Sequence, residues 1–231
     1  MLGPVDYALW FLTALVEASA VVCAIHARCV SRYFALNLYL LTRFVVTAGR
    51  YLVLSRYGFA SVEYWYFYYY SDALDTICLY FALMGLYCHV FEEMGVHRYL
   101  RVGSLLLMGA TAWFSYQIVQ SSSQRLLTRF VVELSQNLYF VGLVLTYLLW
   151  IAVVKLRQTR AQLVQLVLAV GIHFSAFAAN YALRNLYSEF PFWRYVPQVL
   201  ALWLPLAWSY TLLRIPEEAR VATAPVAALR R

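Results

Sequence analysis

Apolar residues gather in seven long stretches along the chain, and short segments richer in polar and charged residues separate them. Each stretch is close to the roughly 20 residues that cross the hydrocarbon core of a bilayer as an α-helix. The pattern therefore predicts an all-α, multi-pass membrane protein, a bundle of seven transmembrane helices. The expected spans are Tyr7–Ile25, Phe34–Leu54, Phe67–Phe91, Tyr99–Val119, Phe130–Val154, Leu163–Leu183 and Val196–Leu213.

Composition agrees with this class and limits what else the chain contains. Apolar residues make up 64% and charged residues 13% of the 231 positions, whereas soluble domains average about half apolar and a quarter charged. Because the spans use most of the chain, no soluble catalytic or nucleic-acid-binding domain fits between them. We expect one transmembrane domain, residues 1–214, followed by a tail, residues 215–231, that is disordered because its sequence lacks apolar periodicity.

Lys and Arg outside the spans are distributed unequally between the two sides of the membrane. Eleven follow the first, third, fifth and seventh spans, and five lie on the opposite side. Because cytoplasmic loops carry the excess of basic residues, we expect the N-terminus outside and the tail in the cytoplasm. The net charge of +7 then reflects topology and attraction to the membrane surface, and we expect no nucleic-acid partner.

Two arginines, Arg43 and Arg50, lie inside the second apolar span, two turns apart on one helical face. A guanidinium at the centre of a bilayer costs roughly 2.5–3.5 kcal/mol even on the lenient insertion scale, so both require partners or water. Four carboxylates in other spans are candidate partners: Glu17, Asp72, Asp75 and Glu133. We therefore expect these side chains to converge on a polar centre inside the bundle.

Most in-span polar residues fall in the outer half of the expected bundle when depth is taken from the helical rise of about 1.5 Å per residue. This asymmetry favours a ligand pocket open to the outside. The expected pocket residues are Glu17, Arg43, Arg50, Asp72, Asp75, Glu133, Gln136, Asn137, His173 and Asn180.

A structural interpretation of the same residues stays open. Arg43 with Glu17 or Asp75, and Arg50 with Asp72 or Glu133, would form closed ion-pair networks that fix the helix register. Against it, four carboxylates outnumber two arginines, and an unpaired carboxylate in a span must be protonated or hydrated.

An aromatic run, residues 64–70, precedes the third span. One interpretation is an interfacial belt, because amphipathic rings favour the headgroup level. The alternative is an aromatic wall for a ligand, since seven consecutive side chains on a helix point in every direction.

The sequence matches none of the cofactor-binding or enzyme motifs that we considered for a membrane protein of this kind. The only lysine, Lys155, lies at the end of the fifth span, where it cannot form a Schiff base with retinal inside the bundle. Glu92-Glu93 followed by Arg98 departs by one residue from the Glu-Glu-x-x-x-Arg motif of intramembrane proteases, and the histidine motifs of those enzymes are missing. We expect no metal, no cofactor and no enzymatic activity.

Short motifs of low specificity, chiefly aromatic and acidic residues near the ends of the spans, are distributed over most of the chain. They are Tyr66-Phe67-Tyr68 before Asp72, Phe91 followed by Tyr99-Leu100, Glu133 with Gln136, and Trp208, Tyr210 and Arg214-Ile215-Pro216-Glu217. In these positions the chain resembles small seven-span bacterial membrane proteins of unknown function. The resemblance implies the seven-span architecture, the importance of Asp72 and Glu133, and the bacterial inner membrane as the location. It implies no activity, and Asp72 departs from the glutamate expected at its position.

The sequence as a whole predicts a receptor-like, ligand-sensing or accessory integral membrane protein. A small polar ligand would bind from the outer side, the lipid bilayer would surround the bundle, and a protein partner would contact the basic cytoplasmic loops. A small-solute or proton-coupled transporter using the same carboxylates is the first alternative. A purely structural subunit of a membrane complex is the second.

Overall fold

Seven long helices make up almost all of the described chain in the computed structural model, which describes residues 4–27, 30–120, 126–156, 160–186 and 196–215. All seven are long and apolar enough to cross a membrane, so the predicted all-α transmembrane bundle is confirmed. They are α1 (Pro4–His26), α2 (Phe34–Tyr57), α3 (Val62–Val90), α4 (His97–Gln120), α5 (Leu126–Lys155), α6 (Ala161–Leu186) and α7 (Val196–Arg214), with a 3₁₀ turn η1 (Glu92–Met94) between α3 and α4. The tail that we expected to be disordered lies outside the described residues from position 216 onward.

Two helices begin at least four residues earlier than the apolar pattern predicts. α3 begins at Val62 rather than Phe67 because Ser61 caps it, its side-chain oxygen accepting the Tyr64 backbone N–H at 3.1 Å. α5 begins at Leu126, four residues before its apolar stretch. Helical hydrogen bonding does not stop at the edge of the hydrocarbon, so polar and aromatic residues extend both helices into the interface.

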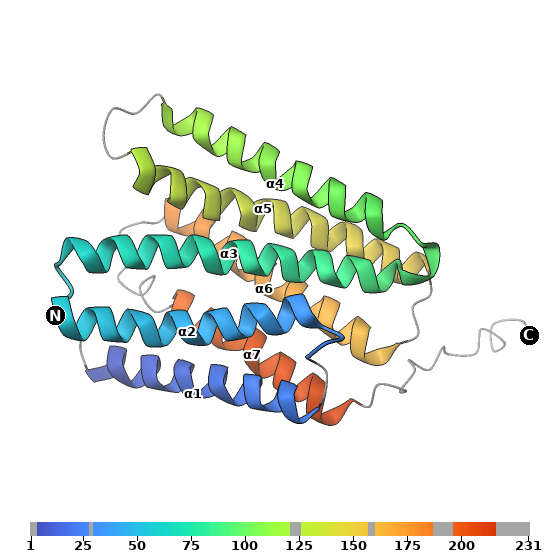
Figure 1. Ribbon diagram of the computed structural model, residues 1–231, viewed down its shortest axis with the longest axis horizontal. Helices are drawn as coiled ribbons and strands as arrows, with labels where there is room; N and C mark the ends of the chain where they lie inside the picture. Colours follow the sequence, from blue (N-terminus) through green and yellow to red (C-terminus); the bar gives the residue numbers. More distant parts are fainter. Residues whose placement is uncertain (1–3, 28–29, 121–125, 157–159, 187–195, 216–231) are drawn as a thin grey trace, which may run out of the picture.

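Six helices form a closed ring in the order α1, α2, α3, α5, α6 and α7, each packed on the next, with α7 returning to α1. α3 also contacts α6 across the ring, and these two helices are the most buried. α4 lies outside the ring, where it packs on α5 and, to a smaller extent, on α3 (Figure 1). The interior of the ring is therefore the place where side chains from many helices can meet.

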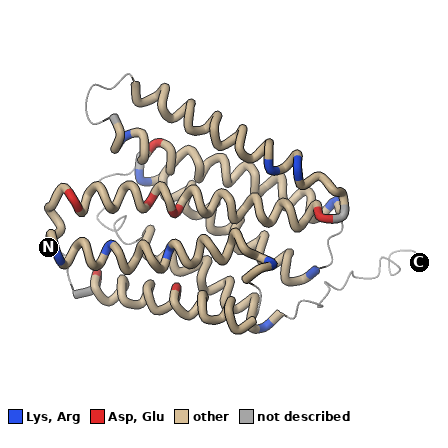
Figure 2. Tube along the Cα trace, in the orientation of Figure 1, with Lys and Arg blue, Asp and Glu red and all other residues tan. Residues whose placement is uncertain are grey.

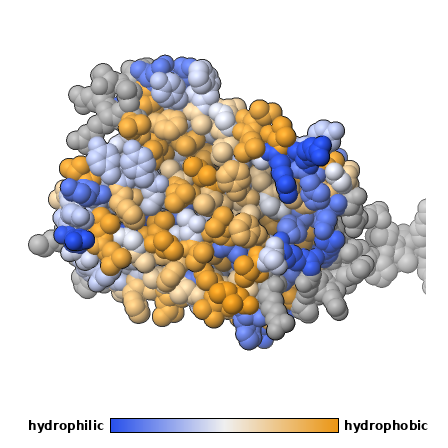
Figure 3. Space-filling view, viewed as in Figure 1, coloured by the Kyte–Doolittle hydropathy of each residue, from blue (hydrophilic) through white to orange (hydrophobic). Residues whose placement is uncertain are grey.

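Charged residues concentrate at the two ends of the bundle, and only a few charged residues of α1, α2 and α3 lie between the ends (Figure 2). On the face that Figure 3 shows, the surface between the ends is mainly hydrophobic. We call the end at which α1 begins the N face and the end at which α7 terminates the C face. The described basic residues at the C face are Arg32, Arg98, Arg101, Lys155, Arg160 and Arg214, and those at the N face are Arg56, Arg129 and Arg184.

Candidate functional site

Arg43, near the middle of α2, joins three helices. Its Nε donates a hydrogen bond to Oε1 of Glu17 on α1 at 3.2 Å, and its Nη1 lies 3.6 Å from Oδ2 of Asp75 on α3. The Glu17 side chain is fully buried, and that of Asp75 is 5% exposed. One guanidinium therefore pairs with both of the carboxylates that the sequence offered as alternatives.

Arg50 forms a second polar group with α3, closer to the N face. Its Nε donates to Oγ of Ser71 at 2.9 Å, and its Nη2 donates to the Tyr68 backbone oxygen at 3.3 Å and lies 3.8 Å from Oδ1 of Asp72. The guanidinium also lies 4.5 Å from the centre of the Tyr68 ring. Residues 68, 71, 72 and 75 share one face of α3, so a single polar stripe on this helix binds both arginines.

Side chains from five of the six ring helices meet near Arg43. Tyr39 lies one turn before Arg43 on the same face of α2, and α3 packs on α5 and α6, which carry Tyr139 and His173. Tyr39, Tyr139 and His173 are buried, each 5% exposed or less. We call this set the central polar layer: Glu17, Tyr39, Arg43, Asp75, Tyr139 and His173.

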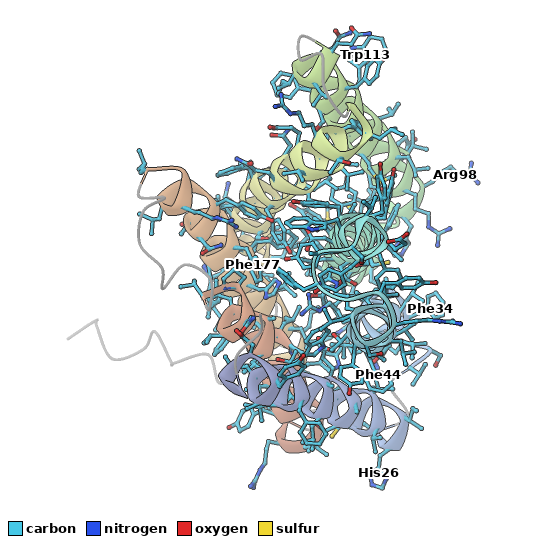
Figure 4. The ribbon with its side chains drawn as sticks, turned by 90° about the vertical axis from the view of Figure 1, so that its left-hand side faces the viewer. His26, Phe34, Phe44, Arg98, Trp113 and Phe177 are labelled. Atoms are coloured by element: carbon cyan, nitrogen blue, oxygen red, sulfur yellow. The ribbon has the colours of Figure 1, made fainter. Side chains whose placement is uncertain are left out.

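Phe177 supports the layer on its N-face side. It lies in the interior of the bundle, whereas Trp113 of α4 projects from the periphery (Figure 4). Its ring stacks on Tyr139 with a centre-to-centre distance of 5.0 Å and contacts His173 at 4.6 Å. Aromatic packing therefore fixes the α5 and α6 members of the layer from one side.

Among the residues that the structure describes, four polar atoms of the layer find no hydrogen-bond partner: Oε2 of Glu17, Oδ1 of Asp75, and both ring nitrogens of His173. An unsatisfied buried polar group costs about 1–3 kcal/mol, and more when it is charged. Native proteins keep such groups rarely, and each instance requires an explanation such as a bound species or a functional role. The layer therefore has free hydrogen-bonding capacity beyond the Arg43 ion pairs: the two carboxylate oxygens can accept, and a neutral His173 ring has one nitrogen that accepts and one that donates.

The exposure of the ion-paired side chains increases toward the N face. Arg43 is 13% exposed, whereas Arg50 is 17% and Asp72 is 34% exposed. Seven residues separate the two arginines, a rise of about 10 Å along α2. Polar side chains thus extend from the partly exposed Arg50 group to the buried layer.

The expected pocket residues do not form one site. Glu133, near the start of α5, lines a separate pocket of about 290 Å³ between α3, α4 and α5. Asn137 donates a hydrogen bond to Oγ of Ser115 on α4 at 2.9 Å. Both residues therefore face the helix outside the ring, which is why Glu133 does not reach Arg50.

Two further expected residues lie on ring helices without a described contact to Arg43. Asn180 is buried two turns from His173 on α6, and its Oδ1 finds no hydrogen-bond partner among the described residues. Gln136 is half-buried one turn before Tyr139 on the same face of α5. They lie toward the N face from the central polar layer.

Sequence reasoning missed the phenol groups and the serine that complete these contacts. Tyr39 lies one turn before Arg43 on the same face of α2, a spacing that could have identified it. Ser71 could have been found as the residue one turn before Asp75 on the polar stripe of α3. Tyr139 carries no such signal, because it is one of 20 tyrosines in the chain and only the packing of α5 on α3 places it.

Comparisons with known proteins give no match: no family model matches the sequence, and neither a curated protein nor a solved structure matches the chain. The resemblance to small seven-span bacterial membrane proteins therefore stays a prediction.

Proposed function

We propose that the chain is a receptor-like, ligand-sensing integral membrane protein that binds a small polar ligand at the central polar layer. The observation that carries this proposal is the set of buried polar atoms on Glu17, Asp75 and His173 that have no hydrogen-bond partner in the described part of the chain. A layer that served only to lock helix register would gain stability from pairing these atoms. Leaving them free is reasonable where another molecule completes the pairing.

Charge balance favours a ligand that is cationic or rich in hydrogen-bond donors. Within the layer two carboxyl groups share the single guanidinium of Arg43. A small amine, or another compact cation, would donate to the free oxygens of Glu17 and Asp75 and balance the second carboxylate. An anion would instead face two carboxylates in a medium of low dielectric constant, where repulsion is strong.

Orientation of the chain with the N face outside is part of the proposal. The described basic residues are more numerous at the C face, as expected of a cytoplasmic surface. The increase of exposure toward the N face gives a ligand an approach from outside, along the Arg50 group. The bacterial inner membrane is the location we infer from the predicted resemblance.

Signalling would follow from competition for Arg43. A ligand that binds the carboxylates would weaken the contacts through which Arg43 joins α1, α2 and α3. The helices would then shift if the ligand binds the rearranged packing more tightly than the original one. α1 and α3 both end at the C face, where exposed basic residues provide a contact surface for a protein partner. A transporter would use the same residues but would release the ligand on the other side.

The test is ligand-dependent thermal stability of the purified protein in detergent. We expect small primary amines to raise the melting temperature saturably, because ligands that bind only the folded state stabilise it by mass action. The rise should disappear in Glu17→Gln and Asp75→Asn and persist in Glu63→Gln, which changes an exposed carboxylate near the start of α3. If no amine or inorganic cation stabilises the wild type, the layer is structural and the proposal fails.

A further inference from the structure

A polar pocket lies away from the central polar layer, near the N face. It has a volume of about 290 Å³, and side chains of α3, α4 and α5 line it. Its polar members are Tyr69, Thr128, Arg129 and Glu133, and aliphatic side chains, among them Val119 and Val132, complete the wall. Pockets for small molecules start at about 300 Å³, so this one fits a molecule the size of an amino acid.

The two charged residues of this pocket stand one turn apart on α5, the spacing at which a helical ion pair often forms. No such pair joins Arg129 and Glu133 among the ion pairs of the described residues. The pocket therefore presents a guanidinium and a carboxylate separately. That arrangement suits a ligand that carries both a positive and a negative charge. A ligand with only one charge would be attracted by one of the two side chains and repelled by the other.

Tyr69 adds an aromatic surface to the pocket. Its ring stacks on Trp65 with a centre-to-centre distance of 5.6 Å and meets Tyr68 edge-on at 5.6 Å. Two aromatic neighbours thus fix a ring whose face can attract a cation within the pocket. The aromatic run that the sequence left open between belt and ligand wall contributes one residue to a polar pocket.

We propose that this pocket binds a small zwitterion. Its ammonium group would contact the Glu133 carboxylate and the Tyr69 ring, and its anionic group would contact the Arg129 guanidinium and the Thr128 hydroxyl. Two sources share this chemistry: a free aminoalkyl phosphate or amino acid, and the headgroup of a phosphatidylethanolamine. Val132, which lines the pocket, is 37% exposed, so the pocket is accessible from the surface of the bundle.

The experiment measures thermal stability with defined probes. For the free source, phosphoethanolamine and glycine are titrated against the Glu17→Gln protein in detergent, in which the amine response of the central polar layer is expected to be lost. Ethanolamine and inorganic phosphate serve as single-charge controls in the same protein. For the lipid source, nanodiscs of phosphatidylethanolamine are compared with nanodiscs of phosphatidylglycerol. We expect stabilisation by one zwitterionic probe, free or lipid-borne, that neither single-charge control reproduces.

Matched variants link the response to the pocket. Arg129→Gln and Glu133→Gln should each raise the apparent dissociation constant at least about tenfold, as expected for loss of one charged hydrogen bond. Arg56→Gln and Glu63→Gln remove exposed charges outside the pocket and should leave binding unchanged. Val132→Trp fills the pocket, retains both charges and should also abolish the response, which keeps the test valid if a charge variant does not fold.

Three outcomes would overturn the proposal: no stabilisation by either source, equal stabilisation by ethanolamine or phosphate alone, or a response that survives Val132→Trp. This test does not depend on whether the central polar layer binds a ligand. Glu17→Gln should abolish the response to simple amines and leave the zwitterion response intact, so either proposal can fail without the other.

Discussion

The ring of Phe174 on α6 occupies the space that a Cβ at Gly142 on α5 would need. Phe174 is fully buried, so its ring cannot move into solvent to make room. We therefore expect Gly142→Ala to destabilise the protein by about 1–3 kcal/mol, the usual cost of overpacking a core. Thermal unfolding in detergent measures the change.

The matched control for that substitution is Gly109→Ala on α4, where a Cβ would meet nothing within 4 Å. Alanine is a better helix former than glycine by about 1 kcal/mol, so this variant should be as stable as the wild type or more stable. Equal destabilisation by the two substitutions would show that α5 and α6 do not approach as closely as described.

Removal of the Arg43 guanidinium should be among the most damaging single changes in the bundle. Arg43→Ala leaves Glu17 and Asp75 buried without their cation, and breaking a buried pair from one side costs about 3–5 kcal/mol. Arg56→Ala removes an exposed guanidinium at the end of α2 and should change stability by less than about 1 kcal/mol. Melting temperatures that fall equally in both variants would mean that Arg43 does not hold the helices together.

Stability should also depend on pH through an ion pair at the C face. Nη1 of Arg160 donates to Oε2 of Glu92 at 2.9 Å, and this hydrogen bond lowers the pKa of Glu92 from its usual 4.5. A lowered folded-state pKa contributes stability above about pH 4.5 that is lost as the pH falls through the folded value.

The variant Glu92→Gln tests this contribution. Because the Glu92 side chain is 52% exposed, the wild type should exceed the variant by less than about 1 kcal/mol at neutral pH. The difference should vanish in acid, and high salt should reduce it. A difference that grows as the pH falls below 4.5 would contradict the ion pair.

Labelling of single cysteines tests the proposed orientation. In a background without Cys23, Cys29, Cys78 and Cys88, we expect Glu63→Cys to react with an impermeant reagent applied to intact cells. Met94→Cys should react only after the membrane is opened, because η1 lies at the C face. Both positions are exposed in the structure, so the reverse labelling pattern would place the N face in the cytoplasm.

The spans were predictable because about 20 apolar residues are needed to cross a bilayer, and each span shows that length. The pairing of Arg43 with Glu17 and Asp75 was predictable as well, since an arginine inside a span needs partners and few carboxylates lie at its depth. The position of Glu133 was not. Its placement depends on α4 lying outside the ring, and nothing in the local pattern of α4 distinguishes a peripheral transmembrane helix from one inside the ring.

Tyr139 and His173 illustrate the same limit at the central polar layer. Each belongs to an apolar span in which one polar side chain can face lipid, a neighbouring helix or the interior. Only the contacts of α3 with α5 and α6 bring both toward Arg43. Long-range packing of this kind leaves no periodic signal in the sequence.

Parallel binding and flux measurements in proteoliposomes distinguish a polar layer that only binds its ligand from one that transports it. An amine that stabilises the purified protein would be supplied as an outward or inward gradient, with internal pH and solute followed together. We predict saturable binding that is lost in Asp75→Asn and no sustained flux of amine or protons. Sustained flux from the wild type that disappears in Asp75→Asn would contradict the sensor account and identify a transporter.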